Sequence, residues 1–274
     1  MLGKLLMIRT PLEIPLWMDW KNRPFAHEEN HPNPHGKTPG DRLWCLGLIK
    51  VGKRVPAKCG FLHSSVNRTS HGIIHMGKKI ILASGSETRQ KLLKNAGVDF
   101  TVETARIDED TIRKSLLQEN ATPRDIADTL AEFKARKVAQ RNPESFVIGC
   151  DQVLVYKGKI YSKSQSISEA ESLLSQMRNQ KHQLLSAVVI YKDAQPDWRH
   201  VGVSRLTMRN LSDPFINDYL RRNWESVRYS VGCYNLEAEG VRLFAQIDGN
   251  FFDILGLPLI PVLSYLAGQG AIAA

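Results

Sequence analysis

The order of apolar and polar positions predicts alternating strands and helices over residues 79–268. An apolar run at 79–83 has the composition of a buried strand, and it stops at a small, hydroxyl-rich turn. A helical pattern begins directly afterwards at 87–96, where Leu92 and Leu93 fall on one face. The chain therefore passes from a strand into a helix N-terminus with a short turn between them.

The rest of this part alternates in the same way. Strands are predicted at 98–103, 145–149, 153–156, 159–161, 182–191, 199–208, 229–233 and 241–247, and helices at 122–140, 168–177, 212–222 and 257–266. Thr122-Pro123-Arg124-Asp125 gives a clear helix start, and Lys157-Gly158 is typical of a hairpin turn. Residues 106–110 are expected to form a polar loop, and the strand at 145–149 to end at Cys150-Asp151. This order predicts a mixed α/β fold whose sheet is not purely parallel.

Residues 1–75 show no such periodicity. They hold 7 of the 13 prolines and 6 of the 8 histidines, so we expect an atypical basic extension, disordered or loosely attached. Its cysteines and histidines lack the close ligand pairs of a zinc finger, which argues against zinc. Met76 stands just before the first predicted strand, so we favour an over-long reading frame and expect the domain to span 76–274.

Composition narrows the class of protein. The 274 residues are 42% hydrophobic and 24% charged, as in globular proteins. Of the net charge of +9, residues 1–75 contribute +6 and residues 76–274 only +3, which makes a nucleic-acid partner unlikely for the main body. No apolar run reaches membrane-span length, so we expect no membrane partner. Four cysteines without a CxxC pair favour a reducing, cytoplasmic location.

The turn Ser84-Gly85-Ser86 is the first candidate for chemistry. It places free backbone N–H groups and the positive end of a helix around one point, which suits a phosphate. Arg89, one turn into the helix, can add a fork of donors. Taken alone, the same residues also suit an ordinary strand–turn–helix with hydroxyl caps, so both interpretations stay open.

Two acids and two lysines form the second group of candidates. Glu109 and Asp151 suit Mg²⁺, which prefers a few carboxylates together with water and phosphate oxygens. Lys134 and Lys163 can neutralise phosphate, although each of the four can also be an ordinary loop, turn or surface residue. The sequence contains no GxxxxGK[ST], GxGxxG or GxSxG motif, which excludes a P-loop NTPase and argues against dinucleotide binding and serine hydrolysis.

Six segments together resemble the Maf family, named for septum formation, whose members are nucleoside triphosphate pyrophosphatases. In chain order they are Leu82–Arg89, Ile107–Glu109, Leu130–Ala135, Ile148–Leu154, Gly158–Lys163 and Gly256–Leu259. The resemblance covers about residues 79–268. It implies an α/β fold similar to that of inosine-triphosphate pyrophosphatases, with an elongated mixed sheet, flanking helices and a nucleotide cleft between two lobes.

The resemblance also implies an activity, which is hydrolysis of a nucleoside triphosphate to the monophosphate and pyrophosphate with Mg²⁺ or Mn²⁺. It implies that Ser84, Ser86 and Arg89 hold phosphate, that Glu109 and Asp151 bind the metal, that Asp151 is the base for the attacking water, and that Lys134 and Lys163 neutralise the triphosphate. A homodimer is compatible with the resemblance.

The chain departs from the family pattern at Glu87 and Ser164, where proline is frequent. Glu87 brings a negative charge close to the expected phosphate site. The pair Asp151-Gln152 resembles the branch that acts on 7-methyl-GTP, in which Tyr234 and Glu237 help to shape the pocket, so Gln152 and Glu237 are expected to contact substrate. A dTTP/UTP pyrophosphatase, a non-catalytic nucleotide-binding regulator of septum formation or cell division, and nucleic-acid binding by the basic N-terminal part remain alternatives.

Overall fold

The computed structural model describes residues 78–273, so the predicted extension at 1–75 and its zinc alternative lie outside the described residues. The elements are β1 (Ile80–Leu82), α1 (Glu87–Asn95), β2 (Thr101–Val102), α2 (Glu109–Gln118), α3 (Pro123–Ala139), β3 (Phe146–Tyr156), β4 (Lys159–Tyr161), α4 (Ile167–Met177), β5 (Lys181–Lys192), β6 (Gln195–Met208), α5 (Asp213–Val227), the 3-10 helix η2 (Glu239–Leu243), β7 (Phe244–Asp248), α6 (Phe251–Ile254) and α7 (Leu259–Gly268). The α/β prediction is confirmed. No helix in 78–273 combines the length and apolar character needed to cross a bilayer.

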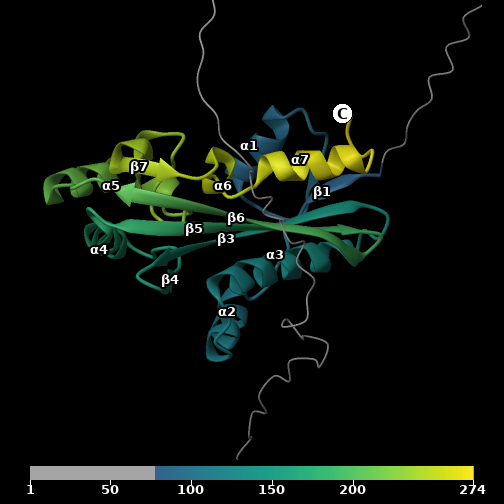
Figure 1. The fold of residues 1–274 in the computed structure, drawn as a ribbon, viewed down its shortest axis with the longest axis horizontal. Coiled ribbons are helices and arrows are strands. Elements are labelled where there is room, and N and C mark those ends of the chain that lie inside the picture. Colours follow the sequence, from purple (N-terminus) through teal and green to yellow (C-terminus); the bar gives the residue numbers. More distant parts are fainter. Residues whose placement is uncertain (1–77, 274) are drawn as a thin grey trace, which may run out of the picture. The chain divides into compact units, whose positions relative to one another are not determined.

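A mixed seven-stranded sheet forms the centre of the domain (Figure 1). Its order is β2-β1-β3-β5-β6-β7, and β4 pairs separately with β3. The first strand is parallel to β2 and β3, whereas the pairs β3–β5, β5–β6 and β6–β7 are antiparallel. The sheet is therefore parallel at one end and a hairpin meander at the other.

Helices cover both faces of this sheet (Figure 1). On one face α3 buries Ile126, Leu130 and Val138 against β3 and β5. On the opposite face α1 and α7 pack against β1 and β3 in a second cluster. A third cluster lies at the end of the sheet where α4 and α5 pack against β6 and β7.

One edge of β3 is covered in two separate places. Residues 146–148 pair with β1, and residues 154–156 pair with β4. None of the described strands pairs with residues 149–153 on that edge, although β5 pairs with the other edge throughout. This interruption opens the sheet at Asp151, and ligand sites in α/β proteins favour such points where neighbouring connections diverge.

Most of the predicted elements are confirmed, including the helix that starts at Thr122. Its hydroxyl accepts from the Asp125 backbone N–H, and the Asp125 carboxylate accepts from the Thr122 N–H, which completes a capping box. The hairpin turn is also confirmed, because Lys157 and Gly158 both have positive φ.

Several local predictions were wrong. Residues 241–243, predicted to begin a strand, lie in the 3-10 helix η2, and the strand starts at Phe244. The polar loop at 106–110 leads into helix α2, because Asp108 caps the backbone N–H of Thr111 and the helix buries Leu116. The strand predicted to stop at 149 continues through Asp151, since the whole segment pairs with β5. The strand predicted at 229–233 is a sequence of turns, in which Cys233 has φ of 56°.

Gly149 sets how closely α3 approaches β3. A Cβ atom at this position would lie 2.2 Å from the Ala131 carbonyl oxygen and 2.6 Å from the Ala135 backbone nitrogen. Both neighbours are helix backbone atoms, so they cannot rotate away. Only a residue without a side chain allows this close packing of helix against strand.

We therefore expect Gly149→Ala to lower the free energy of unfolding by about 3 kcal/mol, because the helix must move off the sheet. Urea denaturation monitored by circular dichroism measures this loss. Gly268→Ala is the matched control, since no atom lies within 4 Å of a Cβ there, and we expect it to leave stability unchanged or to raise it by up to about 1 kcal/mol, because Gly268 is helical. Equal stabilities for the two variants would contradict the role given to Gly149.

Candidate active site

A cleft of about 830 Å³ opens at the interrupted edge of β3. It is lined by the first turns of α1 and α2, by α3 and β3, by the loop after β4, and by the segments 229–237 and 254–256. Most of the residues predicted to form a site line this cleft, namely Ser86, Arg89, Glu109, Lys134, Asp151, Gln152, Lys163, Tyr234 and Glu237. Ser84 is not among the lining residues.

The start of α1 forms one wall of the cleft. Ser86 is the N-cap of this helix, and its hydroxyl accepts from the Arg89 backbone N–H. Ser84 is buried, and its hydroxyl oxygen lies 3.1 Å from Arg89 Nη1 and 3.3 Å from the Ser86 nitrogen. Ser84 therefore supports Arg89 and the turn through hydrogen bonds, without lining the cleft itself. Glu87 is exposed and is also absent from the cleft lining, so its charge does not form part of the wall.

The Arg89 guanidinium is fixed by two backbone carbonyl groups. Nε donates to the Gly256 oxygen at 2.7 Å, and Nη1 donates to the Cys150 oxygen at 3.1 Å, on the uncovered edge of β3. Within the described residues, these bonds and the one to Ser84 use Nε and Nη1 and leave Nη2 as a donor for a ligand. Arg89 is thus pre-oriented by strand and loop backbone.

An acid–lysine centre lies inside the cleft. Lys134 Nζ lies 2.7 Å from Asp151 Oδ1 and 3.0 Å from Glu109 Oε1, so one ammonium group joins α3, β3 and the first turn of α2. Lys134 and Asp151 are 8% and 5% exposed. Partial burial raises the pKa of Glu109, but the charge and hydrogen bond of Lys134, together with the charges of Lys163 and Arg113, outweigh this, so the pKa is below its usual value.

The two carboxylates fit a divalent cation. Asp151 Oδ2 is buried and has no hydrogen-bond partner among the described residues, which leaves one oxygen for a ligand. Residues 78–273 contain no group of three or more His, Cys, Asp and Glu residues that could hold a metal without help. The donor set therefore suits a hard cation that completes its shell with water and phosphate oxygens, as Mg²⁺ does.

Lys163 lies at the exposed side of the same centre. Desolvation by the cleft walls lowers the pKa of its ammonium group, and the nearby Glu109 carboxylate opposes that shift. Arg113 on α2 was missed from the sequence, because no helix was predicted between the polar loop at 106–110 and the helix at 122–140. It also lines the cleft, and its Nη1 donates to Ser162 Oγ at 3.1 Å. The Asp108 cap and the spacing of Ile112 and Leu116 were the signals for this helix.

Two further residues of the cleft lining, Gln152 and Glu237, present hydrogen-bond acceptors. Gln152 Nε2 lies 2.8 Å from Ser186 Oγ. It lies 3.1 Å from the carbonyl oxygen of Asp253 and 3.0 Å from that of Ile254. The amide nitrogen is therefore committed to the protein, which leaves Oε1 as the acceptor for a ligand. Glu237 is exposed, and its carboxylate lies 3.5 Å from the Thr88 hydroxyl.

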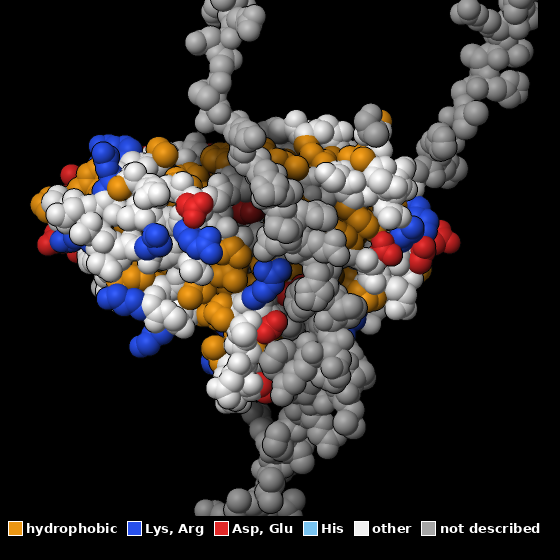
Figure 2. Space-filling view, in the orientation of Figure 1, with side chains coloured by type: hydrophobic (Ala, Val, Ile, Leu, Met, Phe, Trp, Pro, Cys, Tyr) orange, Lys and Arg blue, Asp and Glu red, His pale blue; other side chains and the backbone are white. Residues whose placement is uncertain are grey.

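Acidic and basic side chains are interspersed on the face of the domain drawn in Figure 2. This agrees with the nearly balanced charge of residues 76–274. The positive charge relevant to an anionic ligand is thus the local charge of the cleft lining, to which Arg89, Arg113, Lys114, Lys134 and Lys163 contribute.

The chain is similar in sequence to a family model and to several curated proteins. The sequence model described as Maf-like protein matches residues 79–269. A nucleoside triphosphate pyrophosphatase of Ruegeria sp. (strain TM1040) is 56% identical over 197 residues, which are 72% of this chain and 99% of that protein. The corresponding enzyme of Roseobacter denitrificans is 54% identical over 71% of this chain and 98% of its own length. A 7-methyl-GTP pyrophosphatase of Brucella suis biovar 1 is 43% identical over 72% of this chain and 99% of its own length.

The buried pair Lys134–Asp151 should show strong energetic coupling. We expect Lys134→Met to lower the free energy of unfolding by about 3–5 kcal/mol, because it leaves a buried carboxylate unpaired. The double variant Lys134→Met/Asp151→Asn should recover at least about 1 kcal/mol of that loss. Chemical denaturation of the two single variants and the double variant gives the coupling energy.

The pair Arg221–Asp218 provides the matched control, because its side chains are 77% and 54% exposed. The same cycle with Arg221→Met and Asp218→Asn should give a coupling below about 1 kcal/mol. If both pairs couple equally weakly, the buried pair does not constrain the site as described.

Proposed function

Because the chain belongs to the Maf family, we propose that it is a nucleoside triphosphate pyrophosphatase that releases pyrophosphate and a nucleoside monophosphate. The observation that carries the proposal is that Glu109, Lys134 and Asp151 converge in a cleft that Arg89 also lines. Pyrophosphatases of the same family are similar to this chain over almost their whole length. The cleft volume of about 830 Å³ is in the range expected for a nucleotide-sized ligand.

We propose that Glu109 and Asp151 hold the divalent ion, Mg²⁺ or Mn²⁺. When bound, such an ion lowers the pKa of a water molecule and neutralises phosphate charge. The unpartnered Oδ2 of Asp151 and the lowered pKa of Glu109 support this assignment, because the first leaves an oxygen available and the second favours the charged carboxylate.

Other steps of the proposed reaction, namely proton transfer, charge stabilisation and phosphate binding, are assigned to side chains of the cleft and their neighbours. Asp151 is also the proposed general base: with one carboxylate oxygen on the ion, the other would accept a proton from the attacking water. Lys134, Lys163 and Arg89 stabilise the negative charge that builds on the leaving pyrophosphate. Ser86 contributes the capped N-terminus of α1, whose backbone N–H groups favour a phosphate oxygen. Ser84 acts through Arg89, to which it is hydrogen bonded.

For the base, we propose a modified purine such as that of 7-methyl-GTP. Gln152 Oε1 and the Glu237 carboxylate are acceptors, and the Watson–Crick edge of guanine carries N–H donors. The positive charge of a 7-methylated guanine would in addition be attracted to Glu237. The Brucella suis relative named for this substrate supports the choice. A pyrimidine triphosphate, dTTP or UTP, offers a single ring N–H donor and is the alternative.

The non-catalytic alternative, a nucleotide-binding regulator of septum formation, is less well supported. Binding alone requires cations around a phosphate, which Arg89, Lys134 and Lys163 already provide. It does not require two carboxylates at the same point, because those repel the phosphate unless a metal ion is present. The pair Glu109 and Asp151 therefore favours turnover.

We also propose a cytoplasmic location and a nucleotide-pool housekeeping role. Cys150 and Cys233 are free and buried, as expected for a protein from a reducing compartment. The interspersed surface charge favours a small-molecule substrate over nucleic acid.

We expect Asp151→Asn to reduce kcat about 100- to 10,000-fold, because it removes the proposed base and one metal ligand. Pyrophosphate release with Mg²⁺ or Mn²⁺ measures turnover, and circular dichroism checks the fold. Asp128→Asn is the matched control, since Asp128 is a buried acid on α3 that pairs with Arg199 and does not line the cleft. It should lower stability but leave kcat within about threefold. Full activity of Asp151→Asn would contradict the mechanism.

A nucleotide panel tests the substrate. With 7-methyl-GTP, GTP, dTTP and UTP, we expect pyrophosphate as the product and the highest kcat/KM for 7-methyl-GTP. We expect Glu237→Gln to reduce that preference, because it removes the charge that attracts the methylated base. Release of orthophosphate, or no release, would contradict the enzyme class, whereas a preference for dTTP or UTP would favour the pyrimidine alternative.

A further inference from the structure

The buried residue His182 carries an inference that deepens the proposed function and rests on it. We propose that His182 is a positioning residue that fixes the Tyr234 ring in the wall of the nucleotide cleft, and that this contact sets nucleotide affinity. His182 is on β5, outside the acid–lysine centre, and it does not line the cleft.

The contact between the two side chains is short and buried. His182 Nε2 lies 2.8 Å from the Tyr234 hydroxyl oxygen, and the two residues are 1% and 5% exposed. A buried tyrosine hydroxyl requires a hydrogen-bond partner, and His182 supplies it. His182 Nδ1 is buried without a partner among the described residues. Among the described residues, Tyr234 is therefore the hydrogen-bond partner of the His182 ring.

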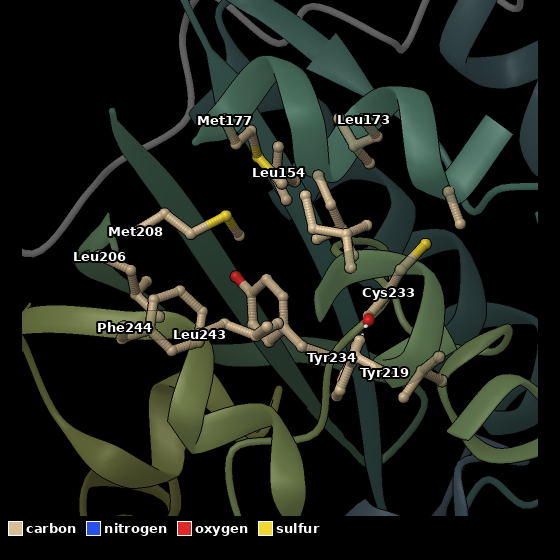
Figure 3. Packing of buried hydrophobic residues seen from close by; sticks show 14 of the residues in the cluster. Leu154, Leu173, Met177, Leu206, Met208, Tyr219, Cys233, Tyr234, Leu243 and Phe244 are labelled. Atoms are coloured by element: carbon tan, nitrogen blue, oxygen red, sulfur yellow. Dashed lines mark hydrogen bonds between the residues drawn. The ribbon is translucent and has the colours of Figure 1, made fainter. Parts of the chain in front are cut away.

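The rings around this bond restrict the orientation of Tyr234. Phe244 packs edge-on against Tyr234 with a centroid distance of 4.8 Å, and it also contacts the His182 ring at 5.9 Å. Figure 3 shows Tyr234 and Phe244 within the buried cluster, together with Leu243 and Met208. Tyr234 nevertheless also lines the cleft. One residue thus connects the buried cluster to the ligand side.

The residue before Tyr234, Cys233, connects the same segment to the loop that carries Lys163. Cys233 has φ of 56°, and its carbonyl oxygen accepts from the Tyr219 hydroxyl at 3.2 Å (Figure 3). Its thiol donates to Ser164 Oγ at 3.2 Å, and Ser164 directly follows Lys163. A shift of Tyr234 would therefore disturb a backbone that also supports the Lys163 loop.

Protonation does not disturb this arrangement near neutral pH. Burial lowers the pKa of His182 to about 4, so the ring is neutral at pH 7. A neutral imidazole has one donor nitrogen and one acceptor nitrogen, so Nε2 can pair with the Tyr234 hydroxyl in either direction. Phenylalanine at position 182 would fill the space but provide no partner.

The test compares His182→Phe, Tyr234→Phe and the double variant by steady-state kinetics with the best substrate of the panel. Both single variants remove the same hydrogen bond, so each should raise KM about 3- to 10-fold, which corresponds to about 0.7–1.4 kcal/mol, and leave kcat within about twofold. The double variant should be no worse than either single variant, because the bond can be lost only once. His182→Gln, which keeps a polar partner, should recover part of the affinity.

Tyr156→Phe is the matched control. Tyr156 is buried in the same cluster, and its hydroxyl donates to the Gln176 carbonyl at 2.6 Å, but it does not line the cleft. It should lose stability without a change in KM, which separates positioning from general loosening of the cluster. Unchanged KM in His182→Phe and Tyr234→Phe, or additive effects in the double variant, would overturn the inference.

Failure of the proposed function gives a different result. If the wild-type protein hydrolyses no nucleotide, the enzymatic proposal fails by itself. Calorimetric affinity for the same nucleotides then replaces KM, and the same ordering of the variants is expected. Equal affinities for wild type, His182→Phe and Tyr234→Phe would overturn the positioning role in that case as well.

Discussion

The burial of the Asp151 carboxylate in the central strand is the constraint on which the rest of the site depends. A charge at 5% exposure is stable only with a partner, and Lys134 supplies one from α3. The helix must therefore lie close to the strand, which Gly149 permits. Ion pairs of Arg199 with Asp128 and Glu132 hold the same helix against β6. The packing of α3 is thus determined by electrostatics as well as by its apolar face.

The interrupted edge of β3 explains why the cleft lies where it does. A strand with pairs along both edges has no free carbonyl groups, but the gap between β1 and β4 leaves the Cys150 oxygen to Arg89. The same guanidinium reaches Gly256, which is 167 residues further along the chain. The arginine therefore joins distant segments at the point where the sheet stops being parallel.

Much of the fold could be predicted because local signals agreed with the final packing. The cap at Thr122, the Lys157-Gly158 turn and the long strands of the β5–β6 hairpin are local features. The local predictions failed where tertiary contacts, rather than local sequence, determined the secondary structure. Pairing with β5 carries β3 through Asp151, and the contacts of Cys233 hold a turn where a short apolar run suggested a strand. Sequence could suggest the charged residues of the site, but not the carbonyl groups of Cys150 and Gly256, because every residue has one.

The alternation of side chains along β3 has a consequence for resistance to oxidation. Asp151 faces α3, whereas the adjacent Cys150 points into the cluster on the opposite face of the sheet. Burial raises the pKa of the Cys150 thiol to about 11, so it stays protonated and out of contact with solvent. The Cys150 sulfur, one residue from the acid–lysine centre, is therefore a poor target for peroxide and a poor ligand for soft metals. Burial of Cys150 within the sheet thus keeps both peroxide and soft metal ions away from its thiol.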